Sequence, residues 1–499
     1  MKRFLASLFI FFFLSATTGF ASVLLRPPPV RKVTLKNGLT LLLLERHQAP
    51  LIAFQVYFRA GSVDDESGKT GLAHLFEHMI FKGTRTLNTR NYNKEKPLLD
   101  ALDKTAVRLI QEEDRGSKAD PKEIQHLKDR LKKLEKEHEK WMVPDEYEKL
   151  YQEHGGEDLN AHTAPDYTSY EVSLPSNKLE LWMRVEADRF RHPVLREFYR
   201  ERSVVMEERR MSYESSPEGK LWEAFVSQAF LAHPYGKPGI GWMSDLNRLT
   251  RPDAEEFFLK YYGPNQAVIV LVGDFSTQRA VWMAEKYFGP IPSRPVPRSR
   301  VSEEPLQEGE RRVEVEFDAG PSLEIGYHEP GLAQPDFLVL KAISSILGQD
   351  RTSRFYKELV EKRKIASSVS TDTDWPGVRF PGLFVIDAEP RHPHSAQELE
   401  EAITVELEKL KQTPVQDWEL EKVRNQFTMQ LVSSLIYNEG AAELLGYYEM
   451  LLQDWSYPWK LQEQIGQIRP EQIQETARRY FRKSNRTTAV LIPAKKNNP

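Results

Sequence analysis

The amino-acid sequence predicts an α+β protein built from two homologous domains, each an antiparallel-rich sheet flanked by helices. Runs of alternating apolar and polar residues, joined by turn residues as at Asn37-Gly38, indicate antiparallel strands. Longer amphipathic helical patterns follow these strands as separate runs, which favours α+β over a parallel βαβ fold. In addition, a chain of 499 residues is too long for a single core.

Residues 1–21 are predicted to form a secretory signal peptide. Lys2 and Arg3 precede an apolar run at residues 4–14, and small residues end the segment at Ala21. We expect cleavage after Ala21, which leaves a mature protein in the periplasm without a membrane span. The alternative is that the segment stays uncleaved and acts as a membrane anchor.

The bulk composition is that of a globular protein with no general affinity for charged polymers. Acidic and basic residues nearly balance, at 73 and 69, so the net charge of -4 gives no reason to expect nucleic acid or an anionic membrane surface as partner. The chain has no cysteine, so its stability must rest on core burial even if it is exported.

The first domain is expected to span residues 30–288. It starts with the strand pair of RKVTLKNGLTLLLLE, which turns at Asn37-Gly38. It ends with RPDAEEFFLKYYGPNQAVIVLVGDF, which begins at Arg251 and is predicted to form a helix, a turn and an apolar strand.

Residues 94–151 are predicted to form a helical hairpin inserted into this domain. A polar break at residues 114–120 separates two helical patterns, and Asp120 and Pro121 mark the start of the second helix as N-cap and first helical residue. The second pattern has a heptad-like seam of Ile124, Leu127, Leu131, Leu134, His138 and Trp141. The hairpin is either a solvated spacer or a docking site for a partner.

A linker at residues 289–310, rich in proline and serine, is expected to lead into a second domain at residues 311–493. That domain again opens with strand-like alternation, RRVEVEFDAGPSLEIGYHEP. It closes with RPEQIQETARRYFRKSNRTTAVLIP, which repeats the helix, turn and strand order of the segment that begins at Arg251. Two copies of one fold are the favoured interpretation, although helix-turn-strand chemistry can produce such similarity by coincidence.

The pentapeptide HLFEH, residues 74–78, is a candidate metal site. On a helix, His74 and His78 lie one turn apart on the same face, so both rings can reach one ion. H-x-x-E-H is the inverted form of a known zinc-peptidase motif, in which the glutamate, here Glu77, is the general base. The alternative is a chance occurrence on an ordinary helix surface, and a catalytic zinc ion would still need a third protein ligand.

Helical phase gives two candidates for that third ligand. In the segment LREFYRERSVVMEERRMSYES, one arc of the predicted helix contains Phe198, Glu201, Val204, Val205 and Glu208. Carboxylates on a partly apolar face need a positive partner, such as a metal ion. The alternative is that all acids of this run are solvated surface residues.

Three ordered blocks resemble the pitrilysin/insulinase family of inverted zinc peptidases, especially the branch with mitochondrial processing peptidase and its bacterial relatives. The blocks are RAGSVDDESGKTGLAHLFEHMIFKGT, GGEDLNAHTAPDYTSY and RERSVVMEERRM. The resemblance extends from about residue 30 to 493 and implies the predicted fold. The interval between His78 and Glu208 is longer than is usual in the family, and the inserted hairpin accounts for the excess.

The resemblance also implies a role for each site residue. His74, His78 and Glu208 would bind Zn²⁺, Glu77 would be the base, and Glu201 would support the metal site without binding the ion. Asn160 and Ala161 would lie on an edge strand that pairs with an extended peptide substrate. The implied activity is zinc-dependent hydrolysis of peptide bonds by an endopeptidase.

The second domain departs from the family pattern. Family members that act alone carry an arginine and a tyrosine there that bind substrate, whereas Val360 and Ser367 stand at these positions. We therefore expect this chain to need a related, metal-less subunit, as in the two-subunit branch of the family. Arg354 or Arg363 offers a local substitute, which would permit a self-sufficient homodimer.

Two other classes of function stay open at this point. One is a non-catalytic scaffold or assembly subunit of the same fold, with the hairpin as docking arm. The other is a periplasmic metal-binding or carrier protein, which would not need Glu77 beside the ligands.

Overall fold

The structure is a computed structural model that describes residues 24–296 and 301–494. The predicted signal peptide, residues 1–21, lies outside this part of the chain. None of the helices between residues 24 and 494 that the structure describes is both long enough and apolar enough to cross a membrane.

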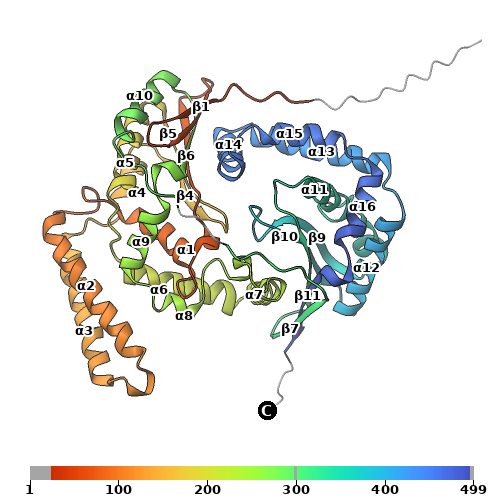
Figure 1. The fold of residues 1–499 in the computed structure, drawn as a ribbon, viewed down its shortest axis with the longest axis horizontal. Coiled ribbons are helices and arrows are strands. Elements are labelled where there is room, and N and C mark those ends of the chain that lie inside the picture. Colours follow the sequence, from red (N-terminus) through yellow and green to blue (C-terminus); the bar gives the residue numbers. More distant parts are fainter. Residues whose placement is uncertain (1–23, 297–300, 495–499) are drawn as a thin grey trace, which may run out of the picture.

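The strands of the described residues form two sheets of the same design (Figure 1). The first sheet, in the order β1-β2-β6-β3-β5-β4, has one parallel pair, β2 with β6, and is otherwise antiparallel. Its strands are β1 (Arg31–Thr34), β2 (Thr40–Glu45), β3 (Leu51–Phe58), β4 (Glu157–Thr163), β5 (Thr168–Pro175) and β6 (Ala267–Gly273).

The second sheet repeats this arrangement in the order β7-β11-β8-β10-β9, with β7 and β11 as its parallel pair. Its strands are β7 (Arg311–Phe317), β8 (Ser322–Glu329), β9 (Ala366–Trp375), β10 (Gly382–Pro390) and β11 (Arg486–Pro493). In each sheet the last strand of the domain inserts between the first two long strands of that sheet. The prediction of an α+β fold with two homologous, antiparallel-rich domains is therefore confirmed.

Helices surround each sheet (Figure 1). Those described in the first domain are α1 (Leu72–Met79), α2 (Tyr92–Glu113), α3 (Pro121–His138), α4 (Glu146–Glu153), α5 (Leu179–Arg191), α6 (Phe198–Arg209), α7 (Pro217–Ala229), α8 (Met243–Leu246), α9 (Arg251–Tyr261) and α10 (Thr277–Tyr287). Those described in the second are α11 (Pro335–Leu347), α12 (Ala396–Gln412), α13 (Asp417–Ser434), α14 (Asn438–Leu452), α15 (Tyr457–Gly466) and α16 (Pro470–Tyr480).

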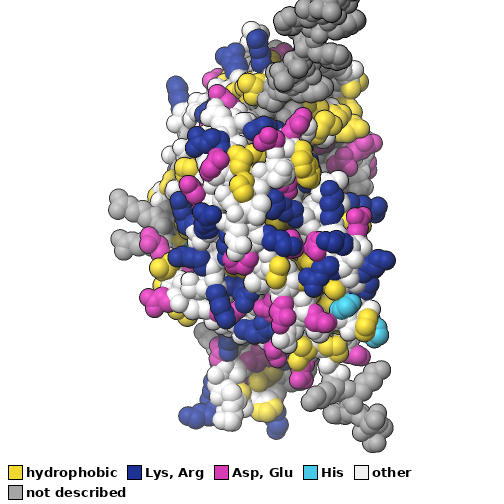
Figure 2. All heavy atoms as spheres, turned by 90° about the vertical axis from the view of Figure 1, so that its right-hand side faces the viewer, with side chains coloured by type: hydrophobic (Ala, Val, Ile, Leu, Met, Phe, Trp, Pro, Cys, Tyr) yellow, Lys and Arg dark blue, Asp and Glu magenta, His cyan; other side chains and the backbone are white. Residues whose placement is uncertain are grey.

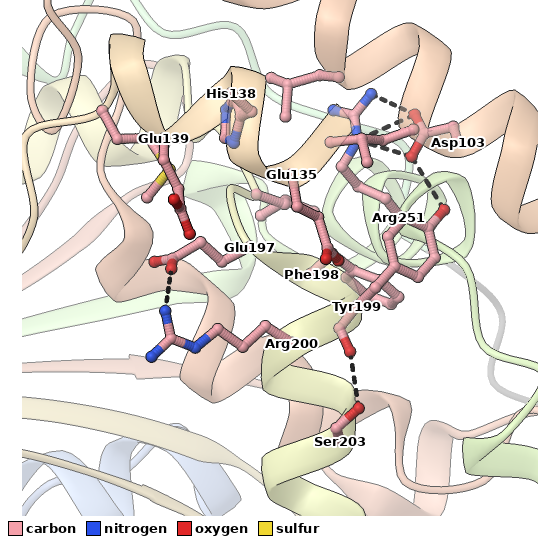
Figure 3. Close-up of a pocket in the computed structure, with 14 residues that line it drawn as sticks. Asp103, Glu135, His138, Glu139, Glu197, Phe198, Tyr199, Arg200, Ser203 and Arg251 are labelled. Carbon is pink, nitrogen blue, oxygen red and sulfur yellow. Dashed lines mark hydrogen bonds and ion pairs between the residues drawn. The ribbon is translucent and has the colours of Figure 1, made fainter. Parts of the chain in front are cut away.

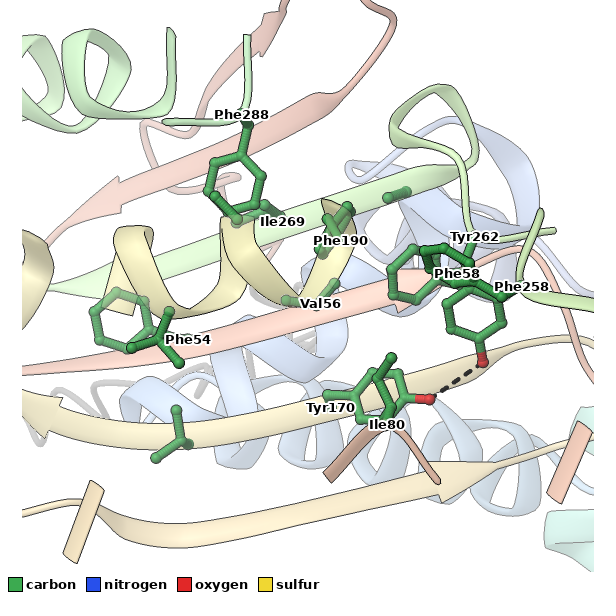
Figure 4. Close-up of a cluster of buried hydrophobic side chains, with 14 of the residues drawn as sticks. Phe54, Val56, Phe58, Ile80, Tyr170, Phe190, Phe258, Tyr262, Ile269 and Phe288 are labelled. Atoms are coloured by element: carbon green, nitrogen blue, oxygen red, sulfur yellow. Dashed lines mark hydrogen bonds between the residues drawn. The ribbon is translucent and has the colours of Figure 1, made fainter. Parts of the chain in front are cut away.

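The core of the first domain lies between its sheet and a group of helices, one of which is α1. Figure 4 shows Phe58 of β3, Tyr170 of β5 and Tyr262, the residue after α9, packed together. The two tyrosine hydroxyls are 3.2 Å apart and share a hydrogen bond within this buried cluster. The aromatic cluster thus forms a rigid base next to the helix that carries HLFEH.

Two equivalent helices cross between the domains. Helix α7 of the first domain packs on β7 and β11 of the second sheet, while α14 of the second domain packs on β3 and β6 of the first sheet. Each sheet therefore buries one face against the other domain. Because this burial is apolar on both sides, the two domains stabilise each other.

Gly446 of α14 allows the close approach of this helix to the first sheet. A Cβ atom at Gly446 would lie 2.2 Å from Cε2 of Tyr57, a β3 side chain that is fully buried. We expect Gly446→Ala to lower the free energy of unfolding by about 1–3 kcal/mol, because overpacking outweighs the better helix propensity of alanine. The shift of the urea denaturation midpoint measures this effect.

Gly466 of α15 provides the matched control for that substitution. It is also a helical glycine, but a Cβ atom there would meet open space. Gly466→Ala should leave stability unchanged or raise it by up to about 1 kcal/mol. Equal effects of the two substitutions would contradict the proposed tight contact at Gly446.

The helical hairpin of α2 and α3 projects from the first domain (Figure 1). Asp120 caps α3 by accepting a hydrogen bond from the amide of Lys122, and Pro121 follows as the first helical residue. Arg108 of α2 donates to Glu123 of α3, and Leu127 is buried between the helices. The segment is therefore a hairpin of two packed helices.

The segment between α10 and β7 has neither helix nor strand among its described residues. It contacts the first domain through Glu304, whose carboxylate accepts hydrogen bonds from the amides of Leu231, Ala232 and His233.

On the outer face of the second domain, acidic and basic side chains are intermixed (Figure 2). That face therefore has no extended patch of one sign.

Candidate metal centre

Helix α1 presents HLFEH at the edge of the first domain's core. The N-cap residue of the helix is Gly71, which has φ of 85°, and a Cβ atom there would lie 2.3 Å from the carbonyl oxygen of Ile240. Buried Asp65 caps the helix from six residues upstream by accepting hydrogen bonds from the amides of Gly71 and Ala73. The glycine and this remote cap together fix the start and direction of α1.

His74, His78 and Glu208 converge on one point. Their candidate ligand atoms all lie within 4.8 Å of one another. Nε2 of His74 is 3.6 Å from Oε1 of Glu208, and Nε2 of His78 is 3.7 Å from Oε2 of Glu208. These distances are too long for hydrogen bonds, so the three groups face a common point without bonding one another.

The carboxylates around this point attract positive charge. Burial, together with His78 and His162, lowers the pKa of His74 to about 4, so the ring stays neutral at pH 7. Burial and the charge of Glu77 raise the pKa of Glu208. Burial alone would lower the pKa of His78, but the surrounding carboxylates outweigh it and the net shift is upward. A neutral ring, a carboxylate and a basic ring that attracts a proton thus surround one point.

Glu201 holds the second histidine from its other side. Nδ1 of His78 faces Oε2 of Glu201 at 3.6 Å, and Lys82 donates a 2.6 Å hydrogen bond to Oε1 of Glu201. Burial would raise the pKa of Glu201, but His78 and Lys82 outweigh burial and lower it to about 2. Glu201 is therefore ionised and faces Nδ1 of His78, while Nε2 of that ring faces Glu208.

The donor set fits a zinc ion. Nitrogen and oxygen ligands of tetrahedral zinc lie about 2.0–2.2 Å from the metal, which puts the ligand atoms about 3.4 Å apart. The separations of 3.6 and 3.7 Å in this structure are close to that value. Two imidazoles and one carboxylate are a common protein ligand set for catalytic zinc, and they leave one position open.

Glu77 lies beside the three candidate ligands without a partner of its own. Its carboxylate is partly exposed and has no hydrogen bond or ion pair with the part of the chain that the structure describes. Its negative charge contributes to raising the pKa of Glu208, His78 and Tyr170. The carboxylate is therefore free to exchange protons with a bound molecule.

The edge strand β4 runs next to α1. Within the described sheet β4 pairs only with β5, so its other edge is unpaired. Asn160 is exposed and Ala161 is half-buried on this strand. The unpaired edge of β4 therefore lies beside the candidate metal site.

The inserted hairpin supports α6, the helix that carries Glu201 and Glu208. Glu95 of α2 is buried and binds both His138 of α3 and Arg196, which lies just before α6. Farther along α2, Asp103 accepts hydrogen bonds from Tyr199 of α6 and from Arg251 (Figure 3). A cavity of about 280 Å³ remains between the hairpin and α6. The hairpin thus fixes the N-terminal end of α6.

The structure brings the predicted site residues together but corrects one part of the helical-phase argument. Glu201 is largely buried, with 13% of its side chain exposed, whereas Glu208 is 40% exposed. Val204, which was expected on the apolar face, is 46% exposed, and Val205 is buried. The arc is therefore only partly buried, because Val204 faces solvent while Val205 faces the core.

Two supporting residues were not predicted from the sequence. Lys82 follows His78 by one helical turn, so its spacing could have indicated a contact with the same carboxylate. Asp65 gave no such signal, because cap rules consider the residue next to the helix, here Gly71.

Val360 and Ser367 of the second domain make contacts within their own domain. Val360 is buried in the core of this domain, and the Ser367 hydroxyl bonds to Glu389. Arg354 is held by a bidentate ion pair with Glu419. Arg363 is exposed at the end of the π-helical turn Tyr356–Lys362. Of the two suggested substitutes, only Arg363 is thus free within the described chain.

Family models match most of the chain. The model described as "Insulinase (Peptidase family M16)" matches residues 41–99 and 114–241. The model described as "Peptidase M16 inactive domain" matches residues 248–427. The first match is interrupted at residues 100–113, which lie in α2 of the hairpin.

Similar proteins include bacterial proteases. "Zinc protease PqqE" of Helicobacter pylori is 27% identical over 475 residues, which is 93% of each chain. The crystal structure of a protease from Helicobacter pylori has a TM-score of 0.78 at 26% identity and covers 94% of this chain and 100% of that one. The periplasmic protease PqqL from Escherichia coli shares the fold, with a TM-score of 0.69 at 16% identity over 93% of this chain and 47% of that chain.

Proposed function

This chain belongs to the insulinase family of peptidases, family M16, and from that premise we propose that it is a zinc-dependent endopeptidase that cuts peptides or unfolded segments. The observation that carries the proposal is the convergence of His74, His78 and Glu208 beside the unpartnered carboxylate of Glu77. A scaffold or a metal carrier would not need a free carboxylate at this place.

His74, His78 and Glu208 are the residues that would hold the zinc ion. When bound, zinc would supply a Lewis acid that polarises a peptide carbonyl and makes a water molecule more acidic. Glu201, held by Lys82, keeps His78 oriented toward this position.

Glu77 would move the proton during hydrolysis. As a general base it accepts a proton from the attacking water, and as a general acid it then delivers that proton to the leaving amine. Because its carboxylate has no partner among the described residues, neither transfer requires an existing ion pair to break.

Substrate recognition would use the backbone of the peptide. Asn160 and Ala161 lie on the unpaired edge strand β4, which contacts α1. A peptide that pairs with this edge must be extended, so unfolded segments are the expected substrates.

Replacement of Glu201 by glutamine should weaken zinc binding by about 10- to 100-fold, because His78 loses the charge that orients its ring. Competition with a fluorescent zinc chelator measures this affinity. Glu197→Gln is the matched control. The carboxylate of Glu197 also faces Lys82, but at the longer distance of 4.0 Å, and it has no contact with His78 among the described residues. Equal zinc affinity of Glu201→Gln and the unmodified protein would contradict the proposed positioning role.

Full activity is expected to need a related, metal-less subunit. This chain has Val360 and Ser367 where lone-acting relatives have substrate-binding residues, and Arg354 is already engaged by Glu419. We expect the purified chain to contain about one zinc ion. Addition of a related subunit that lacks HxxEH should make cleavage of an unfolded peptide at least about tenfold faster. Equal cleavage by the purified chain alone would refute this dependence and favour a homodimer with Arg363 in the substrate site.

The proposed location is the periplasm. The N-terminal segment has the pattern of a secretory signal, and the structurally similar protease PqqL from Escherichia coli is described as periplasmic. Mass spectrometry of the mature N-terminus after export tests both the location and the predicted cleavage after Ala21.

A further inference from the structure

The cavity between the helical hairpin and the first turns of α6 is separate from the metal centre (Figure 3). We call it the hairpin cavity. One wall is formed by α2, α3 and the turn after α3, and the opposite wall mainly by residues 195–203. Within the described chain, none of the candidate metal ligands and no residue of β4 lines it. A ligand in this cavity would therefore not occupy the proposed zinc or peptide sites.

The hairpin cavity has an apolar part and an opening to solvent. Its apolar part is formed by five buried side chains, Leu99, Leu102, Met142, Leu195 and Phe198. The exposed residues Glu139, Arg200 and Ser203 also line it, so a small molecule can enter from solvent. Its volume of about 280 Å³ is just below the range of about 300–1,000 Å³ that is usual for ligand sites. A compact hydrocarbon group therefore fits, and its burial there is favourable.

Two carboxylates of the hairpin line the cavity without a partner. Glu135 is half-buried, and neither its carboxylate nor that of Glu139 has a hydrogen bond or ion pair within the described chain. Burial, followed by the charge of Glu139, raises the pKa of Glu135. The other acidic and basic side chains of the lining form two ion pairs, Glu197 with Arg200 and Asp103 with Arg251. The cavity therefore has an excess of negative charge, which a cation would neutralise.

His138 is an independent sign that a polar group belongs in this cavity. Its side chain is 3% exposed, and its Nε2 lies 2.8 Å from Oε1 of Glu95. Because Arg196 donates two hydrogen bonds to the same carboxylate, Glu95 is an anionic acceptor and Nε2 carries the proton. Nδ1 is then the acceptor of the neutral ring. It has no hydrogen-bond partner in the described chain but is reached by solvent, so it faces the cavity that His138 lines.

We propose that the hairpin cavity binds a small organic cation with an apolar body, such as an arylalkylammonium ion, and that the bound cation stabilises α6 for zinc binding. Glu135 and His138 are three residues apart on α3 and share one face. An ammonium group has three donors, which suit the carboxylate of Glu135 and Nδ1 of His138. The hydrocarbon body would fill the apolar part.

The link to zinc runs through α6 and rests on the proposed function. The wall that α6 contributes comprises Phe198, Tyr199 and Ser203. Glu201, which faces His78, belongs to the same turns of the helix. A ligand that touches both walls gains these contacts only when α6 keeps its position next to the hairpin. Its binding therefore favours the arrangement that holds zinc, and by linkage zinc favours the ligand.

Three compounds test the binding site. Phenethylamine has an aromatic body and an ammonium group, 2-phenylethanol has the same body without the charge, and methylamine has the charge without the body. Isothermal titration calorimetry on the purified protein should give a Kd of about 0.1–1 mM for phenethylamine. We expect 2-phenylethanol to bind at least about tenfold more weakly, because it lacks a charge-assisted hydrogen bond, and methylamine not to saturate.

Two substitutions assign this binding to the hairpin cavity. Glu135→Gln should weaken phenethylamine about tenfold and leave 2-phenylethanol unchanged, because only the charge is lost. Ser203→Phe should prevent binding of both, since a ring introduced at this exposed lining position fills the cavity without altering the core. Glu137→Gln is the control, because it removes the same charge from α3 outside the lining, and it should change the Kd by less than about twofold.

Equal affinity for phenethylamine and 2-phenylethanol would overturn the proposed site. So would binding that neither Glu135→Gln nor Ser203→Phe changes, because the compound would then bind elsewhere. A fold control by circular dichroism shows that each variant keeps its helices, and the conservative Glu135→Gln keeps the test valid if Ser203→Phe does not fold.

Zinc affinity tests the link to α6. Chelator competition should show at least about fivefold tighter zinc binding when phenethylamine saturates the protein. Ser203→Phe is the control for direct effects of the amine on zinc, and its zinc affinity should not respond. Unchanged zinc affinity of the unmodified protein, although phenethylamine binds, would overturn the link. If the protein binds phenethylamine but no zinc under any condition, the proposed function fails and the binding site stands.

Discussion

Replacement of Glu77 by glutamine should lower kcat for peptide hydrolysis by about 10³- to 10⁴-fold and leave zinc content unchanged. Glutamine keeps the size of the side chain but cannot accept and deliver the proton, and general acid-base catalysis contributes an effect of about this order. The zinc ligands are untouched, because His74, His78 and Glu208 face each other without help from Glu77. Steady-state cleavage of a quenched peptide and elemental analysis of zinc measure the two quantities.

The matched control for Glu77→Gln is Glu207→Gln. Glu207 is an exposed residue of α6 that pairs with Arg210 on the surface. Its replacement should change kcat by less than about twofold, since exposed ion pairs contribute little. If Glu77→Gln retains activity similar to that of Glu207→Gln, Glu77 is not the base. If Glu77→Gln instead loses zinc, the residue helps to hold the ion.

Replacement of Glu208 by glutamine should remove both zinc and activity. The substitution replaces the only anionic ligand with a neutral amide, and the two histidines cannot hold the ion alone. The loss of zinc affinity should exceed the roughly 100-fold limit that is typical when a residue merely supports a ligand, as proposed for Glu201. Zinc affinity by chelator competition, measured together with cleavage rate, gives the result.

Glu207→Gln serves as the control here as well, because it removes the same charge one residue away on the same helix. Its side chain leaves α6 in another direction, toward Arg210. Full zinc occupancy of Glu208→Gln would contradict the ligand assignment, whatever the activity. Loss of zinc in both variants would point to a general effect of charge on α6.

Local pattern was sufficient to predict the fold class and to bring the site residues to notice. The segments that begin at Arg251 and Arg469 form a helix and a central strand at equivalent places in the two sheets. HLFEH is on a helix, with His74 and His78 on one face. Such features depend on residues a few positions apart, whose relation is fixed by the repeat of the helix or strand.

Helical phase selected Glu201 and Glu208 but did not by itself distinguish their contacts. In the structure Glu208 faces Nε2 of both histidines, while Glu201 faces Nδ1 of His78. This difference depends on the position and tilt of α6 relative to α1. The inserted hairpin, through Glu95 and Asp103, contributes to that position.

Sequence patterns alone were enough to predict the two-domain α+β plan and the helix that carries HLFEH. They also selected Glu201 and Glu208 as the two candidates for the third metal ligand. By contrast, the crossing of α7 and α14 between the domains and the contacts of Asp65 and Lys82 at the site became known from the folded structure. Repeat patterns and caps are short-range, whereas these contacts join residues distant in sequence. Their geometry follows from the packing of whole elements, which no local pattern specifies.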